Sequence, residues 1–167
     1  SRGLGDVYKR QVYDVNQQAF GRPDEARLVE ALRRGPGPTI SLVSEADGRI
    51  VGHIFFSPVV LETPSGERRT LLGLAPMAVL PDYQGRGIGS ALVRRGLEAC
   101  AEAGHPVVVV LGHPGYYPRF GFRPSTAWGV TCAYDVREEA FMLAELEPGA
   151  LAGLRGVVRY PPVFDGV

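Results

Sequence analysis

The sequence has few cysteines and no excess of charge of either sign, and both shortages restrict what the chain can be. Its two cysteines, Cys100 and Cys132, lie far apart, so they form neither a disulfide framework nor a CxxC pair for zinc or redox chemistry. Eighteen basic and eighteen acidic residues leave a formal net charge of zero, so no overall field attracts nucleic acid or an anionic membrane. We therefore expect no metal, no nucleic-acid partner and no membrane partner, and any anion site must be local.

Long apolar segments are also missing. No uninterrupted apolar run approaches the roughly 18 residues that span a bilayer, and no charged-then-apolar signal segment opens the chain. These absences predict a cytoplasmic protein. The chain does contain 167 residues, of which 45% are hydrophobic and 22% charged, and this is enough for one globular domain with its own core.

The first eleven residues stand apart from the rest. The segment SRGLGDVYKRQ follows neither a helix nor a strand period, and a patterned segment begins abruptly at Val12. Its last six residues resemble the translation of an adapter that transposase-based library preparation adds to DNA. We interpret residues 1–11 as a non-native tail that replaces the native start of the chain, and residues 12–167 as the single domain.

Periodicity and turn signals predict an α+β fold built on one sheet. Asp47-Gly48 between two β-branched runs is a hairpin signal, and four consecutive valines at 107–110 indicate a central strand covered on both faces. Helices interleaved with mostly antiparallel strands are typical of this class. The expected helices cover 12–20, 23–34 and 90–103, with a short helical link at 148–154, and the expected strands cover 40–46, 50–61, 71–80, 107–111, 130–133, 141–146 and 157–160.

A proline interrupts one of these strands. Pro76 lies inside the apolar run 71–80 and has no N–H to give to a neighbouring strand. Prolines in strands occur at bulges and at open edges. We therefore expect the strand to separate from its neighbour near this residue.

A glycine-rich loop follows that strand and precedes the strongest helical pattern in the chain. Main-chain N–H groups and a helix dipole at such a place can hold a phosphate, although a tight strand-to-helix turn is the plain alternative. A GxGxxG dinucleotide fingerprint needs glycine at position 90, where Ser90 stands, and the P-loop ending Gly-Lys-Ser/Thr is absent. Both nucleotide motifs therefore fail.

Two segments resemble motifs of the GCN5-related N-acetyltransferase (GNAT) family. Residues 74–93, with Gln-x-x-Gly-x-Gly-Ser opening a helix, resemble its acetyl-coenzyme A motif. Residues 113–122 resemble the His-Pro-x-Tyr-Tyr-Pro-x-Phe-Gly-Phe run of one subgroup. The resemblance covers about residues 12–124 and implies a mixed, mostly antiparallel sheet with flanking helices and a splayed strand pair.

The resemblance also implies a set of residues that bind acetyl-CoA. The glycine loop would hold the pyrophosphate, and the bulged strand would pair with the pantetheine arm through its main chain. The loop residues are Gln84, Gly85, Arg86, Gly87, Ile88, Gly89 and Ser90, and the strand residues are Met77, Ala78 and Val79.

Acetyl transfer to an amine needs a proton donor for the departing thiolate and an acceptor for the amine proton. By resemblance Tyr117 is the acid, with Tyr116 as its rival, because only Tyr117 has the family's spacing to Gly121-Phe122. The base has no pattern of its own. We take His113, at the carboxyl end of the central strand, before the other candidates, which are His53, Glu62 and Asp82.

We therefore expect an acetyl-CoA-dependent N-acetyltransferase that acts on a primary amine of a small molecule or a protein by direct attack in a ternary complex. A catalytically silent acyl-CoA-binding regulatory domain is the alternative. The strand expected at 157–160 allows pairing within the chain or across a homodimer.

Overall fold

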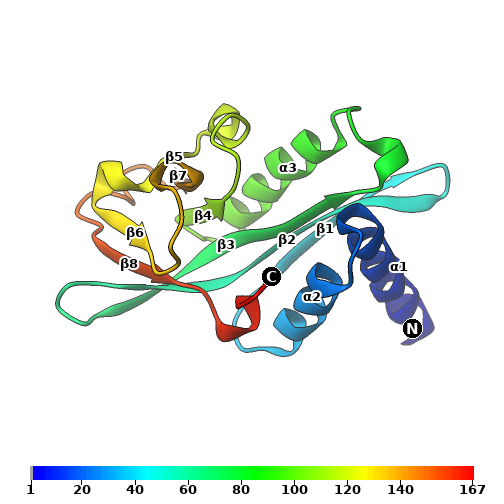
Figure 1. Cartoon of the computed structure of the whole chain (residues 1–167), viewed down its shortest axis with the longest axis horizontal. Helices are drawn as coiled ribbons and strands as arrows, with labels where there is room; N and C mark the ends of the chain where they lie inside the picture. Colours follow the sequence, from blue (N-terminus) through cyan, green and yellow to red (C-terminus); the bar gives the residue numbers. More distant parts are fainter. Residues whose placement is uncertain (1) are drawn as a thin grey trace. The chain divides into compact units, whose positions relative to one another are not determined.

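The computed structural model describes residues 2–167, and the side chains from residue 5 onward. Along the chain two helices precede three strands, and a third helix separates these strands from the remaining five, an arrangement typical of an α+β fold (Figure 1). The helices are α1 (Arg2–Phe20), α2 (Asp24–Arg34) and α3 (Ile88–Glu102). The strands are β1 (Ile40–Ala46), β2 (Arg49–Glu62), β3 (Arg68–Val79), β4 (Val107–Leu111), β5 (Arg123–Pro124), β6 (Val130–Cys132), β7 (Phe141–Glu145) and β8 (Gly156–Arg159).

The strands form one mixed sheet in the order β5-β7-β4-β3-β2-β8-β6, and β1 pairs with β2. The β3–β4 and β6–β8 pairs are parallel, whereas β1–β2, β2–β8, β4–β7 and β5–β7 are antiparallel. The predicted fold class is therefore confirmed. Strand β8 pairs within the chain on both of its edges, with β2 and with β6.

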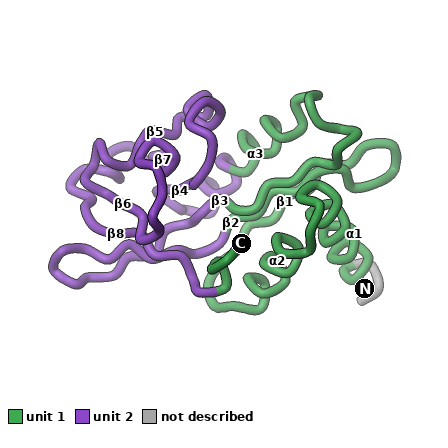
Figure 2. The backbone as a smooth tube through the Cα atoms, in the orientation of Figure 1, with its two compact units in different colours: residues 1–56, 75–96, 163–167 green, residues 57–74, 97–162 purple. Residues whose placement is uncertain are grey.

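The chain divides into two compact units (Figure 2). Unit 1 contains residues 1–56, 75–96 and 163–167, and unit 2 contains residues 57–74 and 97–162. Strands β2 and β3 and helix α3 contribute residues to both units. The glycine loop belongs to unit 1, and both Tyr117 and His113 belong to unit 2.

In unit 1 the helices cover opposite faces of β2. His53 contacts Asn16 on α1, whereas Phe56, three residues further along the strand, packs against Gly96 on α3. A Cβ atom at position 96 would lie 2.6 Å from the Phe56 ring, so the helix approaches the sheet as closely as a glycine allows. Alternating residues of a strand point to opposite faces, and a strand covered on both faces is apolar almost throughout, as β2 is.

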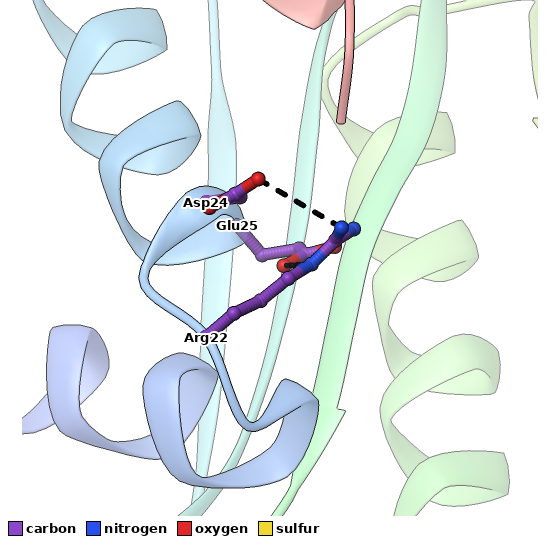
Figure 3. Close-up of polar contacts among 3 residues, drawn as sticks. All are labelled: Arg22, Asp24 and Glu25. Atoms are coloured by element: carbon purple, nitrogen blue, oxygen red, sulfur yellow. Dashed lines mark hydrogen bonds and ion pairs between the residues drawn. The ribbon is translucent and has the colours of Figure 1, made fainter.

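The turn between α1 and α2 is held by one arginine (Figure 3). Arg22 donates from Nε to Glu25 Oε1 over 3.0 Å and from Nη2 to Glu25 Oε2 over 2.6 Å, and its Nη1 lies 3.7 Å from Asp24 Oδ2. Both carboxylates lie in the first turn of α2, where the helix dipole favours negative charge. The paired guanidinium compensates for the burial of Glu25.

The centre of unit 2 is the valine strand β4. It runs parallel to β3 from Leu72↔Val108 to Leu74↔Val110 and antiparallel to β7 along its whole length, and its four valines are buried. The prediction of a central strand at 107–111 is confirmed. The core around it is completed by residues of β2, β6, β7 and β8 and by Leu151 and Leu154.

Two expectations about helices are wrong. Helix α1 begins at Arg2 rather than at Val12. Its second half is packed through the buried Val12 and Val15, and a helix that has formed extends readily into preceding residues that have no apolar period of their own. Ser1 lies outside the described residues. The link expected at 148–154 forms turns instead of a helix, since Gly149 and Gly153 adopt φ angles of +81° and +73°.

Pro76 does not break its strand, although an interruption was expected. Strand β3 continues from Arg68 to Val79, and the Ala75–Pro76 peptide bond is cis. The parallel ladder with β4 covers Leu72–Leu74 and ends two residues before the proline. The pairing of β3 with β4 therefore ends near the proline, as expected, without a break in β3.

Across residues 2–167 every helix is too short or too polar to cross a membrane.

Candidate active site

The glycine loop connects β3 to α3. A single 3-10 turn, Pro81–Tyr83, follows the strand, and the helix begins at Ile88. Gly85 and Gly87 adopt φ angles of +76° and +83°, a left-handed conformation that costs other residues about 1–2 kcal/mol. No atom lies within 4 Å of a Cβ built on either glycine, so backbone conformation explains both, and the space beside them is open.

The loop places the amino end of a 15-residue helix beside this space. The N–H of Ala91 donates to the carbonyl of Gly87 over 3.0 Å, which marks Gly87 as the residue that caps the helix. The N–H groups of Ile88 and Gly89 precede the first helical hydrogen bond, so they have no acceptor within the helix. Together with the helix dipole they form a site that suits a phosphate or another anion.

Side chains at the start of the loop fix its conformation. Gln84 Nε2 donates to the carbonyl of Val79 at the end of β3 over 3.0 Å. The Tyr83 hydroxyl donates to Asp47 Oδ2 in the β1–β2 turn over 2.6 Å, and the guanidinium of Arg86 lies 4.9 Å from the centre of the Tyr83 ring. The loop is thus attached both to β3 and to the hairpin turn. The Asp47–Tyr83 contact joins residues 36 positions apart, and no local pattern in the sequence indicates it.

The three strand residues assigned to the cofactor differ in exposure. Ala78 is buried in a cluster with Val15, Val51 and Leu80, so its side chain belongs to the core of unit 1. Met77 and Val79 are half-buried. Any contribution of these residues to ligand binding must come from the main chain or from the half-buried side chains.

Tyr117 is the first residue of the 3-10 turn Tyr117–Phe120, which is capped by Gly121. The residue is 9% exposed, and its ring meets those of Tyr116 and Phe122 edge to face, with centroid distances of 5.1 and 5.7 Å. Burial, with a smaller effect of Tyr116, raises the pKa of the Tyr117 hydroxyl to about 12. At neutral pH this hydroxyl is therefore protonated and is a hydrogen-bond donor.

His113 follows β4 by two residues and is exposed. Its carbonyl accepts hydrogen bonds from the N–H groups of Tyr116 and Tyr117 over 3.1 and 3.3 Å. The main chain of His113 therefore holds the turn that carries both tyrosines.

The other base candidates have different surroundings. His53 is fully buried, both of its ring nitrogens are hydrogen-bonded, and burial lowers its pKa to about 3, so it is a structural residue. Glu62 lies 3.2 Å from Arg159 in an exposed ion pair between β2 and β8. Asp82 is exposed in the 3-10 turn before the glycine loop. Among the described residues, no group of three or more His, Cys, Asp and Glu side chains is placed to hold a metal ion.

Comparison with known proteins identifies the family. A family model described as the acetyltransferase (GNAT) domain matches residues 2–125. The chain is 37% identical over 150 residues to the uncharacterized N-acetyltransferase YhbS of Escherichia coli, and this alignment covers 89% of this chain and 88% of YhbS. It is 40% identical over 133 residues to the uncharacterized N-acetyltransferase YjhQ of the same organism, and this alignment covers 77% of this chain and 72% of YjhQ.

Solved structures agree with this result. The crystal structure of Escherichia coli YhbS in complex with CoA matches with a TM-score of 0.85 and 34% identity, over 95% of this chain and 87% of that one. A GNAT family acetyltransferase from Brucella melitensis in complex with acetyl-CoA matches with a TM-score of 0.75 and 36% identity, over 94% and 92% of the two chains. The chain therefore belongs to the GNAT family of N-acetyltransferases.

Proposed function

We propose that this chain transfers the acetyl group of acetyl-CoA to a primary amine of a small molecule or a protein, by direct attack in a ternary complex. The observation that carries the proposal is the glycine loop, where two left-handed glycines leave open space beside the amino end of α3. A diphosphate fits this arrangement, because main-chain N–H groups and a helix dipole both favour an anion. The solved relatives with bound CoA and acetyl-CoA support the same choice of ligand.

Both the main chain and the side chains of the loop contribute to binding. Gly85, Gly87 and Gly89 let the backbone approach the ligand, and Ile88 and Ser90 belong to the first turn of α3. Gln84 holds the loop to the end of β3. The guanidinium of Arg86 adds a positive charge at the loop.

The pantetheine arm is assigned to the main chain of Met77, Ala78 and Val79. The ladder between β3 and β4 ends at Leu74, so on the β4 side these residues lie beyond the paired part of β3 and are suited to an added strand-like partner. The burial of Ala78 in the core gives this stretch a fixed backbone.

When bound, acetyl-CoA supplies the acetyl group as a thioester. Tyr117 holds a proton at its hydroxyl throughout the neutral range and is assigned to donate it to the leaving sulfur. His113 is assigned to accept the amine proton, because its imidazole is exposed at the carboxyl end of β4. The main chain of the same residue holds the tyrosine turn.

The test is release of free thiol from acetyl-CoA in the presence of a panel of amines, for the wild type, Tyr117→Phe and Tyr116→Phe. We expect Tyr117→Phe to lower kcat by about 100-fold or more, the size of a general-acid contribution, with little change in the affinity for acetyl-CoA. Tyr116→Phe is the matched control and should retain most of the turnover. Equal turnover of Tyr117→Phe and the wild type would show that Tyr117 is not the acid. Failure to release thiol with any amine of the panel would contradict the transferase proposal.

A further inference from the structure

The main chain of Gly112 is fixed in place at the end of β4. Its N–H donates to the carbonyl of Ala140 over 2.9 Å, which extends the antiparallel pairing of Leu111 with Phe141 by one step. On its other side, His113 accepts two hydrogen bonds from the turn that contains Tyr117. The backbone at position 112 therefore has little freedom to move away from a neighbour.

The ring of Tyr117 occupies the space that a side chain at position 112 would fill. A Cβ atom built on Gly112 would lie 2.9 Å from Cδ2 of Tyr117 and closer still to Cε2. Real Cβ atoms do not approach ring carbons so closely, so one of the two groups would have to move. The φ of Gly112 lies outside the left-handed region, and backbone conformation therefore does not require glycine there. What requires it is the tyrosine ring.

The remaining neighbours of the ring leave it few ways to shift. Tyr116 and Phe122 meet it edge to face, and the ring centroid of Phe120 lies 6.4 Å from that of Tyr117. Phe122 is itself fully buried. Since packed interiors contain few voids, a displaced ring would move the hydroxyl rather than settle into empty space.

We propose that Gly112 is a positioning residue, whose lack of a side chain sets where the Tyr117 hydroxyl lies. The inference rests on the proposed role of Tyr117 as the acid. Proton transfer depends on the distance and direction of the donor, and a misplacement of about 1 Å costs on the order of 100-fold in rate. Gly112→Ala would therefore act on the chemical step through the Tyr117 hydroxyl.

Gly115 offers a matched control in the same turn. No atom lies within 4 Å of a Cβ built on Gly115, and its φ is also outside the left-handed region. We expect Gly112→Ala to lower kcat by about 10- to 100-fold with the KM for acetyl-CoA within about twofold of the wild type, and Gly115→Ala to leave both unchanged. Equal kcat for the two variants would overturn the proposal.

A second measurement separates positioning from a general structural effect. In the Tyr117→Phe background the hydroxyl is already absent, so Gly112→Ala should lower kcat no further. Loss of the same factor in both backgrounds would overturn the proposal. If Tyr117→Phe retains the kcat of the wild type, Tyr117 is not the acid and the proposed function loses that assignment. If Tyr117→Phe has a low kcat but Gly112→Ala has that of the wild type, only the positioning role of Gly112 is overturned.

If Gly112→Ala does not fold, the same contact can be measured through folding. Tyr117→Leu removes the ring that a Cβ atom at position 112 would meet, so Gly112→Ala should regain a cooperative unfolding transition in that background. Failure of the double variant to fold, where Tyr117→Leu alone folds, would overturn the proposal.

Discussion

Asn16 on α1 and His53 on β2 are hydrogen-bonded to each other, with Asn16 Nδ2 3.1 Å from His53 Nδ1 and neither side chain exposed. Asn16 Nδ2 also donates to the carbonyl of Val12 over 3.0 Å. Because an amide nitrogen only donates, Nδ1 of the imidazole is the acceptor and Nε2 carries the ring proton. That proton is donated to Ser41 Oγ, 2.8 Å away. The neutral side chain of His53, on β2, thus links α1 to β1 through hydrogen bonds to Asn16 and Ser41.

This arrangement makes the fold sensitive to acid. Burial, with a smaller effect of Arg33, lowers the His53 pKa to about 3, whereas in the unfolded chain it is near 6.5. Protonation therefore favours the unfolded chain, and stability falls as the pH drops from about 6.5 toward 3. Between pH 7 and pH 5 His53 should account for a loss of about 2 kcal/mol in the free energy of unfolding. Urea denaturation at both pH values measures it, and His53→Gln should lose less over the same interval. An equal loss in the two proteins would contradict the prediction.

Gly87→Ala should weaken acetyl-CoA binding about tenfold. The substitution forces an L side chain into a φ of +83°, at a cost of about 1–2 kcal/mol, and the loop relieves the strain by changing the conformation that presents its N–H groups. Gly66→Ala is the matched control, because Gly66 has a φ of +87° and open space around it in the β2–β3 turn. Calorimetry with acetyl-CoA should find weaker binding for Gly87→Ala alone. If both variants bind as the wild type does, the loop is not the binding site.

Gln84→Ala should weaken acetyl-CoA binding less, by about three- to tenfold. The variant loses the hydrogen bond from Nε2 to the carbonyl of Val79, which attaches the loop to β3 and contributes about 1 kcal/mol. Gln17→Ala, on the exposed side of α1, is the comparison and should bind as the wild type does. Wild-type affinity for Gln84→Ala would show that this attachment does not matter for binding.

The pH profile of turnover tests the protonation state of Tyr117. With a pKa raised to about 12, the hydroxyl keeps its proton up to about pH 10, so its ionisation should not lower kcat below that pH. A fall in kcat between pH 8 and 9.5 that is present in the wild type and absent from the residual activity of Tyr117→Phe would contradict this assignment.

The parts of the site that the sequence predicted are those made of neighbouring residues. Gln84 to Ser90 form one continuous segment, a loop followed by the first residues of α3, and the turn of Tyr117 closes within a few positions at Gly121, so local pattern predicts both. The partners of His53, at positions 16 and 41, come from another helix and another strand. No local pattern indicates such contacts, so the sequence alone does not distinguish the buried structural His53 from a candidate base.

The two errors in the predicted secondary structure have separate causes. Residues 2–11 have no apolar period, yet they are helical because the chain after them is packed. In residues 148–154 the alanines and leucines favour a helix but Gly149 and Gly153 do not, and Glu145 accepts hydrogen bonds from the N–H groups of Gly149 and Leu151 and stabilises turns instead. In both cases packing or a single side chain outweighed local propensity.

The glycine loop can be tested directly by amide NMR of protein labelled with ¹⁵N-glycine. We predict that saturating CoA shifts the amide signals of Gly85, Gly87 and Gly89, and that pantetheine, which lacks the diphosphate, leaves them in place. Unchanged signals from these three glycines with CoA, or equal shifts with pantetheine, would contradict the binding of the diphosphate by this loop.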